Sequence, residues 1–458
     1  MSAKEEPCDS VYLFHSEEEL ADLAQQTVEM AKSMGAEESL AVTSESGGMT
    51  ARASGGRLES VRRDGMQSMA ITVYDAQRTG RASTQDLSPP ALRKTVEQAI
   101  AIARQVQPDE FAGLPDPDWV CRVQKRVPLH EPGQFTTADL IETATSIESG
   151  ALALSGQDTV RVVDAGVSSH ETRWARATSQ GFRAAAASSI HMRWCVAISE
   201  REQIMVRDYA SSIDRRASGL MAPDAVGQEA ARRSLARLGA RGLSTRKAPV
   251  LFDARVATTL LADLSSALNG ISQYRGQTFF PEPLEKELLA AHLSLVEDPF
   301  EPYGLASAAH DSDGVAGSAR NVVEDGVVRG LFLSAFAARK LGMLPTGNAD
   351  GPNNLTLVSR LAGTDDDLSS LWKRMDCGLW LTEFVGGGVD PVTGAYSKAA
   401  SGFWIEDGQV SHPVHDFTVA GELPRMLKAI VAVGTDTFRD GAFRTGSILV
   451  DEMQIAGR

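Results

Sequence analysis

Residues 57–84 read RLESVRRDGMQSMAITVYDAQRTGRAST. Apolar and polar residues alternate through Met69–Tyr74 and again through Arg78–Thr84, which is typical of strands with one buried face. Glycine pairs at 47–48 and 55–56 interrupt the flanking sequence, as turns between hairpin strands do. We therefore expect an antiparallel meander of short strands in this region.

Helices are predicted on both sides of this meander. Ser16 and Glu19 form a capping box ahead of apolar residues at helical spacing, and Gly35 ends that helix. A second helix begins after Pro90, because the following apolar residues again recur on one face. A third helix is expected near Thr137–Ser155. Helix, meander and helix in this order indicate an α+β fold.

The chain changes character at two points. Prolines concentrate between about 108 and 134 and predict an extended crossing without regular structure. After Lys247, a short buried strand and a helix over Ala254–Leu268 precede mostly glycine-punctuated strands. We expect an N-terminal α+β domain, 1–246, with a helix-covered antiparallel sheet, and a β-rich C-terminal domain, 247–458.

Composition restricts the class of protein. The 458 residues include 60 acidic and 45 basic side chains and carry a formal charge of −15, which repels a nucleic-acid backbone. One basic run, Arg232–Lys247, contains no acid, and a solvated helix face is its favoured interpretation. No apolar stretch approaches the roughly 20 residues that cross a bilayer. The charged start and scattered cysteines favour a reducing, cytoplasmic location.

Several ordered segments of the chain form a distinctive set. In the N-terminal half they are residues 57–74, 83–89 and 243–252, which read RLESVRRDGMQSMAITVY, STQDLSP and LSTRKAPVLF. In the C-terminal half they are residues 338–349, 386–408 and 455–458, which read ARKLGMLPTGNA, GGGVDPVTGAYSKAASGFWIEDG and IAGR. Together these segments resemble the PmbA/TldE family, whose members pair with TldD in a bacterial zinc-peptidase complex. The resemblance implies a TldD/PmbA-like fold for nearly the whole chain.

The resemblance also implies that this chain lacks the zinc site of TldD-type subunits, which carry a helical His-Glu-x-x-x-His motif. The similar stretch here, Val256–Gly270, reads VATTLLADLSSALNG and contains no histidine, cysteine or glutamate. Ala262 and Ala267 align with the two histidines, and Asp263 aligns with the glutamate. Zinc hydrolysis needs imidazole ligands and a base beside the metal-bound water. We therefore expect no catalytic residue and no metal in this chain, with zinc held by the partner subunit.

Other catalytic constellations are weak in this sequence. His412, His415 and Asp416 have a spacing that some metal sites use, but on a strand the two rings would point to opposite faces. A structural role is favoured for them. Gly-x-Ser-x-Gly, Walker and dinucleotide-binding motifs do not occur.

The glycine triplet near the C-terminus is the other candidate site. Apolar strands adjoin it on both sides, so a bulge or a close backbone approach is expected rather than a flexible linker. Bare edge amides beside it could pair with an extended peptide. For the polar residues that follow, a hairpin role and a peptide-lining role remain equally open. The candidate peptide- or partner-facing residues are Gly386, Gly387, Gly388, Thr393, Tyr396 and Ser397.

The leading hypothesis is a non-catalytic scaffold subunit that docks a TldD-like zinc subunit and limits access to unfolded peptides. By resemblance, the complex would trim leader peptides and degrade labile antitoxins, and the chain alone could form a homodimer. One alternative is a hydrolase with an unrecognised site. Another is a binding module that modulates DNA gyrase, which would need the basic run at 232–247.

Overall fold

The computed structural model describes residues 13–123, 125–133, 135–363 and 366–457. These residues form two compact units. The N-terminal unit extends to Val120 and continues from Pro128 to Ala236, and the C-terminal unit comprises Cys121–Val127 and everything from Arg237 onward. The unit changes at the end of helix α4 (Pro223–Ala236), whereas the boundary was expected at residue 246, which is the first residue of strand β8 (Arg246–Phe252).

The N-terminal unit is a six-stranded antiparallel sheet in the order β3-β2-β1-β4-β5-β6, with four α-helices. Its strands are β1 (Glu38–Ser54), β2 (Arg57–Asp75), β3 (Arg78–Thr84), β4 (Thr159–Thr178), β5 (Arg183–Arg201) and β6 (Ile204–Asp214). Its helices are α1 (Glu17–Ser33), α2 (Pro89–Ala103), α3 (Thr137–Leu152) and α4 (Pro223–Ala236), and a 3-10 turn, η1, spans Ala217–Gly219. The α+β prediction is confirmed.

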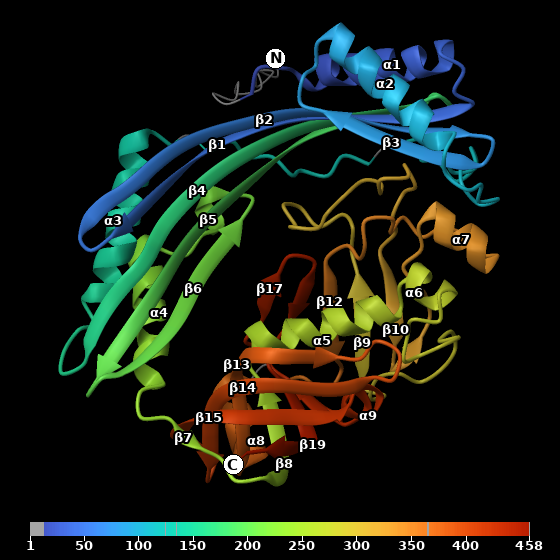
Figure 1. Cartoon of the computed structure of the whole chain (residues 1–458). Helices are drawn as coiled ribbons and strands as arrows, with labels where there is room; N and C mark the ends of the chain where they lie inside the picture. Colours follow the sequence, from blue (N-terminus) through green and yellow to red (C-terminus); the bar gives the residue numbers. More distant parts are fainter. Residues whose placement is uncertain (1–12, 124, 134, 364–365, 458) are drawn as a thin grey trace, which may run out of the picture. The chain divides into compact units, whose positions relative to one another are not determined.

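All four helices cover one face of this sheet, on the outer side of its curve in Figure 1. Ala41 of β1 is buried with α1 and α2, and Ala51 of the same strand is buried with α3. The two positions are ten residues apart, an even number, so they face the same side of the sheet. The predicted capping box is present, because Ser16 accepts from the N–H of Glu19 and the Glu19 carboxylate accepts from Ser16 N–H.

The expectation of short strands was wrong for β1 and β2, which run through their internal glycines for 17 and 19 residues. Gly47 lies directly opposite Gly65, so the glycines of the two strands face each other instead of forming turns. At Gly48, a Cβ atom would lie 2.3 Å from the Ser169 carbonyl oxygen and 2.6 Å from the His170 ring. Glycine there permits close strand and ring packing. The turn falls at residues 55–56.

The end of the proline-rich crossing packs on the sheet in the N-terminal unit. Ser189 N–H donates to the Leu129 carbonyl oxygen over 3.1 Å, and Glu131 N–H donates to Ser189 Oγ over 2.8 Å. The buried His191 ring donates from Nε2 to the Glu131 carbonyl oxygen over 3.1 Å. Its Nδ1 lies 3.0 Å from Ser169 Oγ. These contacts tie residues 129–131 to β4 and β5.

In the part that the structure describes, the C-terminal unit contains two sheets and five helices. The six-stranded sheet has the order β11-β10-β9-β12-β18-β17, formed by β9 (Leu293–Glu297), β10 (Arg320–Glu324), β11 (Val327–Val328), β12 (Leu355–Ser359), β17 (Phe438–Asp440) and β18 (Phe443–Thr445). The seven-stranded sheet has the order β16-β19-β8-β13-β14-β15-β7, formed by β7 (Arg241–Gly242), β8 (Arg246–Phe252), β13 (Gly378–Val389), β14 (Ala395–Glu406), β15 (Gln409–Glu422), β16 (Ile430–Val433) and β19 (Ile448–Ala456). The helices are α5 (Ala254–Ala267), α6 (Gly270–Tyr274), α7 (Ala335–Leu341), α8 (Leu368–Met375) and α9 (Leu423–Lys428).

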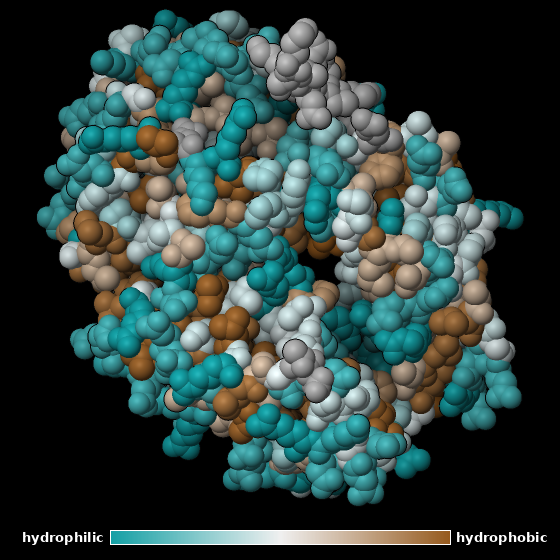
Figure 2. Space-filling model, turned by 180° about the vertical axis from the view of Figure 1, so that it is seen from behind, coloured by the Kyte–Doolittle hydropathy of each residue, from teal (hydrophilic) through white to brown (hydrophobic). Residues whose placement is uncertain are grey.

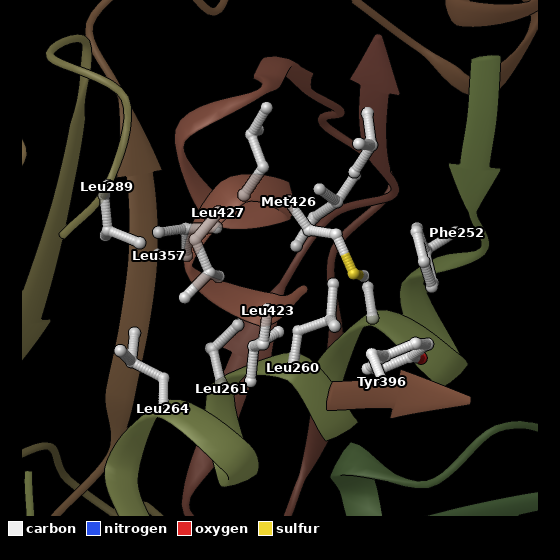
Figure 3. Close-up of a cluster of buried hydrophobic side chains, with 14 of the residues drawn as sticks. Phe252, Leu260, Leu261, Leu264, Leu289, Leu357, Tyr396, Leu423, Met426 and Leu427 are labelled. Carbon is white, nitrogen blue, oxygen red and sulfur yellow. The ribbon is translucent and has the colours of Figure 1, made fainter. Parts of the chain in front are cut away.

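Helix α5 lies at the centre of the C-terminal unit. It contacts β17 and β18 of one sheet and β8 and β13 of the other. Its buried leucines Leu260, Leu261 and Leu264 join a large apolar core that also holds Phe252 and Tyr396, as Figure 3 shows. Such a core fixes the helix, because burying each large side chain contributes about 1.5–3 kcal/mol relative to its exposure.

The surface is mixed. Figure 2 shows hydrophilic residues interspersed with small hydrophobic patches on the face that it presents. Among the described residues, no helix is both long and apolar enough to span a bilayer.

Candidate functional site

Helix α5 begins where the sequence predicts it. Asp253 caps the helix by accepting from Arg255 N–H over 3.1 Å. The three positions that replace a metal motif lie in the second half of this helix. Ala262 and Asp263 are partly buried, and Ala267 is buried.

Asp263, on α5, forms an ion pair with a lysine from strand β14. Lys398 Nζ, on β14, lies 3.3 Å from Asp263 Oδ2. The two side chains are 12% and 26% exposed, so the pair is largely shielded from solvent. Burial raises the pKa of the Asp263 carboxyl above its ordinary value, and the Lys398 ammonium offsets part of this increase.

Two aromatic rings complete the surroundings of the lysine. Its ammonium lies 4.8 Å from the ring centroid of Phe384 and 5.0 Å from that of Tyr396, distances at which a ring face attracts a cation. Tyr396 is itself buried, and within the described residues its hydroxyl has no hydrogen-bond partner. Burial, and secondarily the Asp263 carboxylate, raise the pKa of this hydroxyl.

The glycine triplet lies on β13, where this strand pairs with β14. Gly386, Gly387 and Gly388 are exposed, and Gly387 stands opposite Lys398 in the hairpin. The register shifts between Phe384 and Gly386, which is the bulge that the sequence predicted. Gly387 has a φ of +95°, and a Cβ atom there would lie 2.3 Å from the Ser397 carbonyl oxygen. The expected close backbone approach is therefore present.

The residues that follow the triplet play different parts. Asp390 Oδ1 accepts from Val392 N–H and Thr393 N–H over 2.8 and 3.0 Å, and these bonds lower the pKa of its carboxyl. Thr393 Oγ1 in turn accepts from Ala395 N–H over 3.2 Å. Thr393 thus serves the hairpin turn, while Ser397 is exposed on the strand.

A pocket of about 150 Å³ opens beside Asp263. Polar and apolar side chains share its wall, which is lined by Asp263, Ser266, Ala267, Gln277, Phe279, Val389 and Pro391. The pocket brings two of the three degenerate metal-motif positions together with the end of β13. Its volume corresponds to one large amino-acid side chain.

The neighbouring edge of β13 is partly bare. Strand β8 pairs with β13 only at Leu379–Leu381, so in the described part of the chain Gly386–Val389 pair with β14 alone. Val385, at the bulge, is 69% exposed. A strand edge of this kind offers backbone N–H and C=O groups to an extended chain.

These residues do not fit a zinc ion. Zinc sites in proteins use imidazole, thiolate or carboxylate ligands, usually three or four together. Alanine at 262 and 267 supplies none, and the carboxylate of Asp263 is already paired with an ammonium. Across the described residues, no group of three or more His, Cys, Asp and Glu side chains is placed to hold a metal ion.

The other sequence candidates are not assembled into a site. His415 Nδ1 lies 3.0 Å from Asp416 Oδ2, and His412 Nδ1 lies 3.0 Å from Ser411 Oγ. Both histidines therefore have local partners on β15. Four of the six cations in the basic run at 232–247 also have acidic partners: Arg232 and Arg233 pair with Glu229, Arg237 with Glu383, and Lys247 with Glu452.

Lys398 and the aromatic ring of Phe384 are the functional-site features that sequence reasoning missed. Lys398 is the sole cation in the quoted stretch 386–408, and it stands two residues after Tyr396. On a strand, this spacing places both side chains on one face. That isolated charge among small residues was the available signal.

Family models cover most of the chain. Residues 44–103 match the PmbA/TldA metallopeptidase domain 1, residues 130–238 match the central domain, and residues 245–457 match the C-terminal domain. The candidate site lies within the last of these. The chain belongs to the PmbA/TldD family of metallopeptidase-related proteins.

Individual relatives extend over nearly the whole chain. "Metalloprotease PmbA" of Escherichia coli O157:H7 is 38% identical over 93% of both chains, and "Metalloprotease PmbA homolog" of Haemophilus influenzae is 35% identical over 96% of this chain and 97% of its own. A "Metalloprotease TldD homolog" of Buchnera aphidicola is 23% identical over 46% of each.

Solved structures share the fold. A putative modulator of DNA gyrase from Bacteroides thetaiotaomicron matches with a TM-score of 0.88 and 23% identity, over 97% of this chain and 100% of that one. TldE from Thermococcus kodakarensis matches with a TM-score of 0.82 and 17% identity, over 95% and 100%. The predicted TldD/PmbA-like fold is confirmed.

Proposed function

We propose that this chain is a non-catalytic partner subunit of a TldD/TldE-type zinc metallopeptidase complex. It docks a TldD-like subunit, which holds the zinc, and limits access to unfolded peptides. One observation carries the proposal: on a family fold matched over 97% of the chain, α5 offers a single carboxylate, and that carboxylate is paired with Lys398. Such a helix cannot activate water through a metal.

The hairpin of β13 and β14 is the proposed peptide contact. The bare edge at Gly386–Val389 can add an extended peptide as a strand, with main-chain hydrogen bonds that are independent of sequence. The adjoining pocket accepts one side chain of that peptide. In this arrangement Ser397 faces solvent on the hairpin, whereas Tyr396 supports it from the core.

The proposed cellular role comes from the family resemblance. In this proposal the complex works in the cytoplasm, where it trims leader peptides and clears labile antitoxins, and a homodimer is the possible state of the chain alone. Relatives called metalloprotease along nearly their full length support the part of the proposal that concerns proteolysis. The gyrase-modulator name of a structural neighbour receives little support from the charges, because four of the six cations in the basic run are paired with acids.

Mass photometry of this chain with and without a TldD-type subunit from the same organism tests the assignment. We expect a one-to-one complex that forms at submicromolar concentration. A TldD-type subunit that stays separate and cleaves an unfolded peptide at full rate without this chain would contradict the proposed function.

Photo-crosslinking tests the peptide contact. A crosslinker placed at Val385, which is 69% exposed, should capture an unfolded peptide in the assembled complex. The same crosslinker at Leu361, which is 58% exposed and lies outside the hairpin, is the matched control. Equal capture at both positions would remove the hairpin from the account.

A further inference from the structure

Lys398 projects from β14 toward α5. Its neighbours two positions away, Tyr396 and Ala400, belong to the apolar core that surrounds α5. Alternation along the strand therefore directs the lysine side chain to the same side. Its ammonium reaches Asp263, 135 residues earlier in the chain, and the side chain is only 12% exposed.

A largely buried ammonium is unfavourable unless other groups replace its water shell. Three groups do so here. Asp263 supplies a full negative charge at 3.3 Å, and the ring faces of Phe384 and Tyr396 supply partial negative charge at 4.8 and 5.0 Å. These three groups form a cation-binding site, and the ammonium group of Lys398 occupies it.

We propose that Lys398 is the resident cation of this site, which ties α5 to the β13–β14 hairpin and keeps divalent metal ions away from α5. The inference goes beyond the assignment as a partner subunit. That assignment rests on the absence of zinc ligands, whereas here the positive charge of Lys398 itself excludes metal ions. A dication near Asp263 would meet the ammonium at close range in a poorly solvated place, where like charges repel strongly.

A mutant cycle on the chain alone tests the first half of this inference. Lys398→Met leaves a carboxylate without its counter-ion, and Asp263→Asn leaves an ammonium without its own, so each single change should lower the Tm. The double variant should be more stable than the sum of the single changes predicts. Lys398→Arg, which retains the charge, should preserve most of the Tm. Additive effects of the two substitutions would overturn the claim that the pair joins α5 to the hairpin.

Metal binding tests the second part of the proposal, that Lys398 keeps divalent metal ions away from α5. Histidines are introduced by Ala262→His and Ala267→His, and Zn²⁺ binding is measured by calorimetry with Lys398 present and with Lys398→Met added. We expect the Met variant to bind Zn²⁺ at least tenfold more tightly. Lys247→Met in the same double-histidine background is the control, because Lys247 also pairs with a carboxylate, Glu452 at 3.2 Å, but is 65% exposed.

Equal Zn²⁺ affinity with and without Lys398 would overturn the exclusion role. An absence of Zn²⁺ binding in both double-histidine chains would also overturn it. The lack of further ligands besides the two histidines would then be enough to keep the metal away, whether or not Lys398 is present. These measurements use this chain by itself, so their failure is distinguishable from a failure to form a complex with a TldD-type subunit.

Discussion

Position 387 requires glycine for two reasons, the conformation of its backbone and the close packing around it. Its φ of +95° lies in the region that L side chains rarely adopt. A Cβ atom would also lie 2.3 Å from the Ser397 carbonyl oxygen across the hairpin. Both features arise where β13 leaves its bulge and passes Lys398.

Gly387→Val should therefore destabilise the C-terminal unit. The backbone conformation alone costs about 1–3 kcal/mol for a residue other than glycine. Gly388→Ala is the matched control, because a Cβ atom at Gly388 meets nothing within 4 Å and its φ is not positive. Thermal unfolding and binding of the TldD-type subunit should both suffer in the first variant and stay near wild type in the second. Unchanged values for Gly387→Val would remove the backbone argument.

At the scale of single residues, only part of this site could be predicted from the sequence. The bulge and the close approach near the triplet could be predicted, because glycines between apolar strands indicate a backbone that a side chain would obstruct. The ion pair of Asp263 with Lys398 could not, because it joins a helix to a strand 135 residues away. Tyr396, for which a lining role was open, is a core residue.

The elements were predicted well where capping and periodicity act locally. Helices α1 and α5 begin within one residue of their expected starts, and α2 begins at Pro89, two residues before its expected start. The long strands β1 and β2 were divided wrongly at their internal glycines, because a glycine that accommodates a neighbouring ring resembles one that forms a turn. Strand β6 was not anticipated, and its pairing with β5 is a tertiary property.

The stability of the contact between residues 129–131 and strands β4 and β5 should depend on pH. Burial lowers the pKa of His191 below its ordinary value of 6.5. The unfolded chain therefore takes up the proton first as the pH falls, and the contribution of His191 to stability, full above about pH 6.5, is lost progressively toward its folded-state pKa. Protonation also conflicts with the hydrogen bond that Nδ1 accepts from Ser169.

Hydrogen exchange measures this loss locally. Protection factors of the Glu131 and Ser189 amides, which bond across this contact, should fall between pH 7 and pH 5. In His191→Gln the side chain can still bond both partners but does not titrate, so the same protection factors should depend much less on pH. Identical pH profiles in the two proteins would show that another group governs the contact.

The charge distribution of the whole molecule leads to a prediction about nucleic acid. The net charge is −15, and four cations of the basic run are paired with carboxylates. We expect no measurable binding of the chain to duplex DNA at 50 mM salt in a fluorescence-anisotropy titration. Salt-sensitive binding that disappears on Arg241→Gln would instead favour the gyrase-related alternative.

The central claim concerns the whole molecule: we propose that a chain with this family fold, whose helix α5 lacks the ligands that would hold zinc, has a task other than catalysis. Cleavage of an unfolded peptide, followed with each subunit alone, with both together and with both plus a zinc chelator, is the most direct test. We predict that this chain alone is inert, that addition of the TldD-type subunit gives cleavage above that of the TldD-type subunit alone, and that the chelator abolishes it. Robust cleavage by this chain alone that resists the chelator would contradict the account.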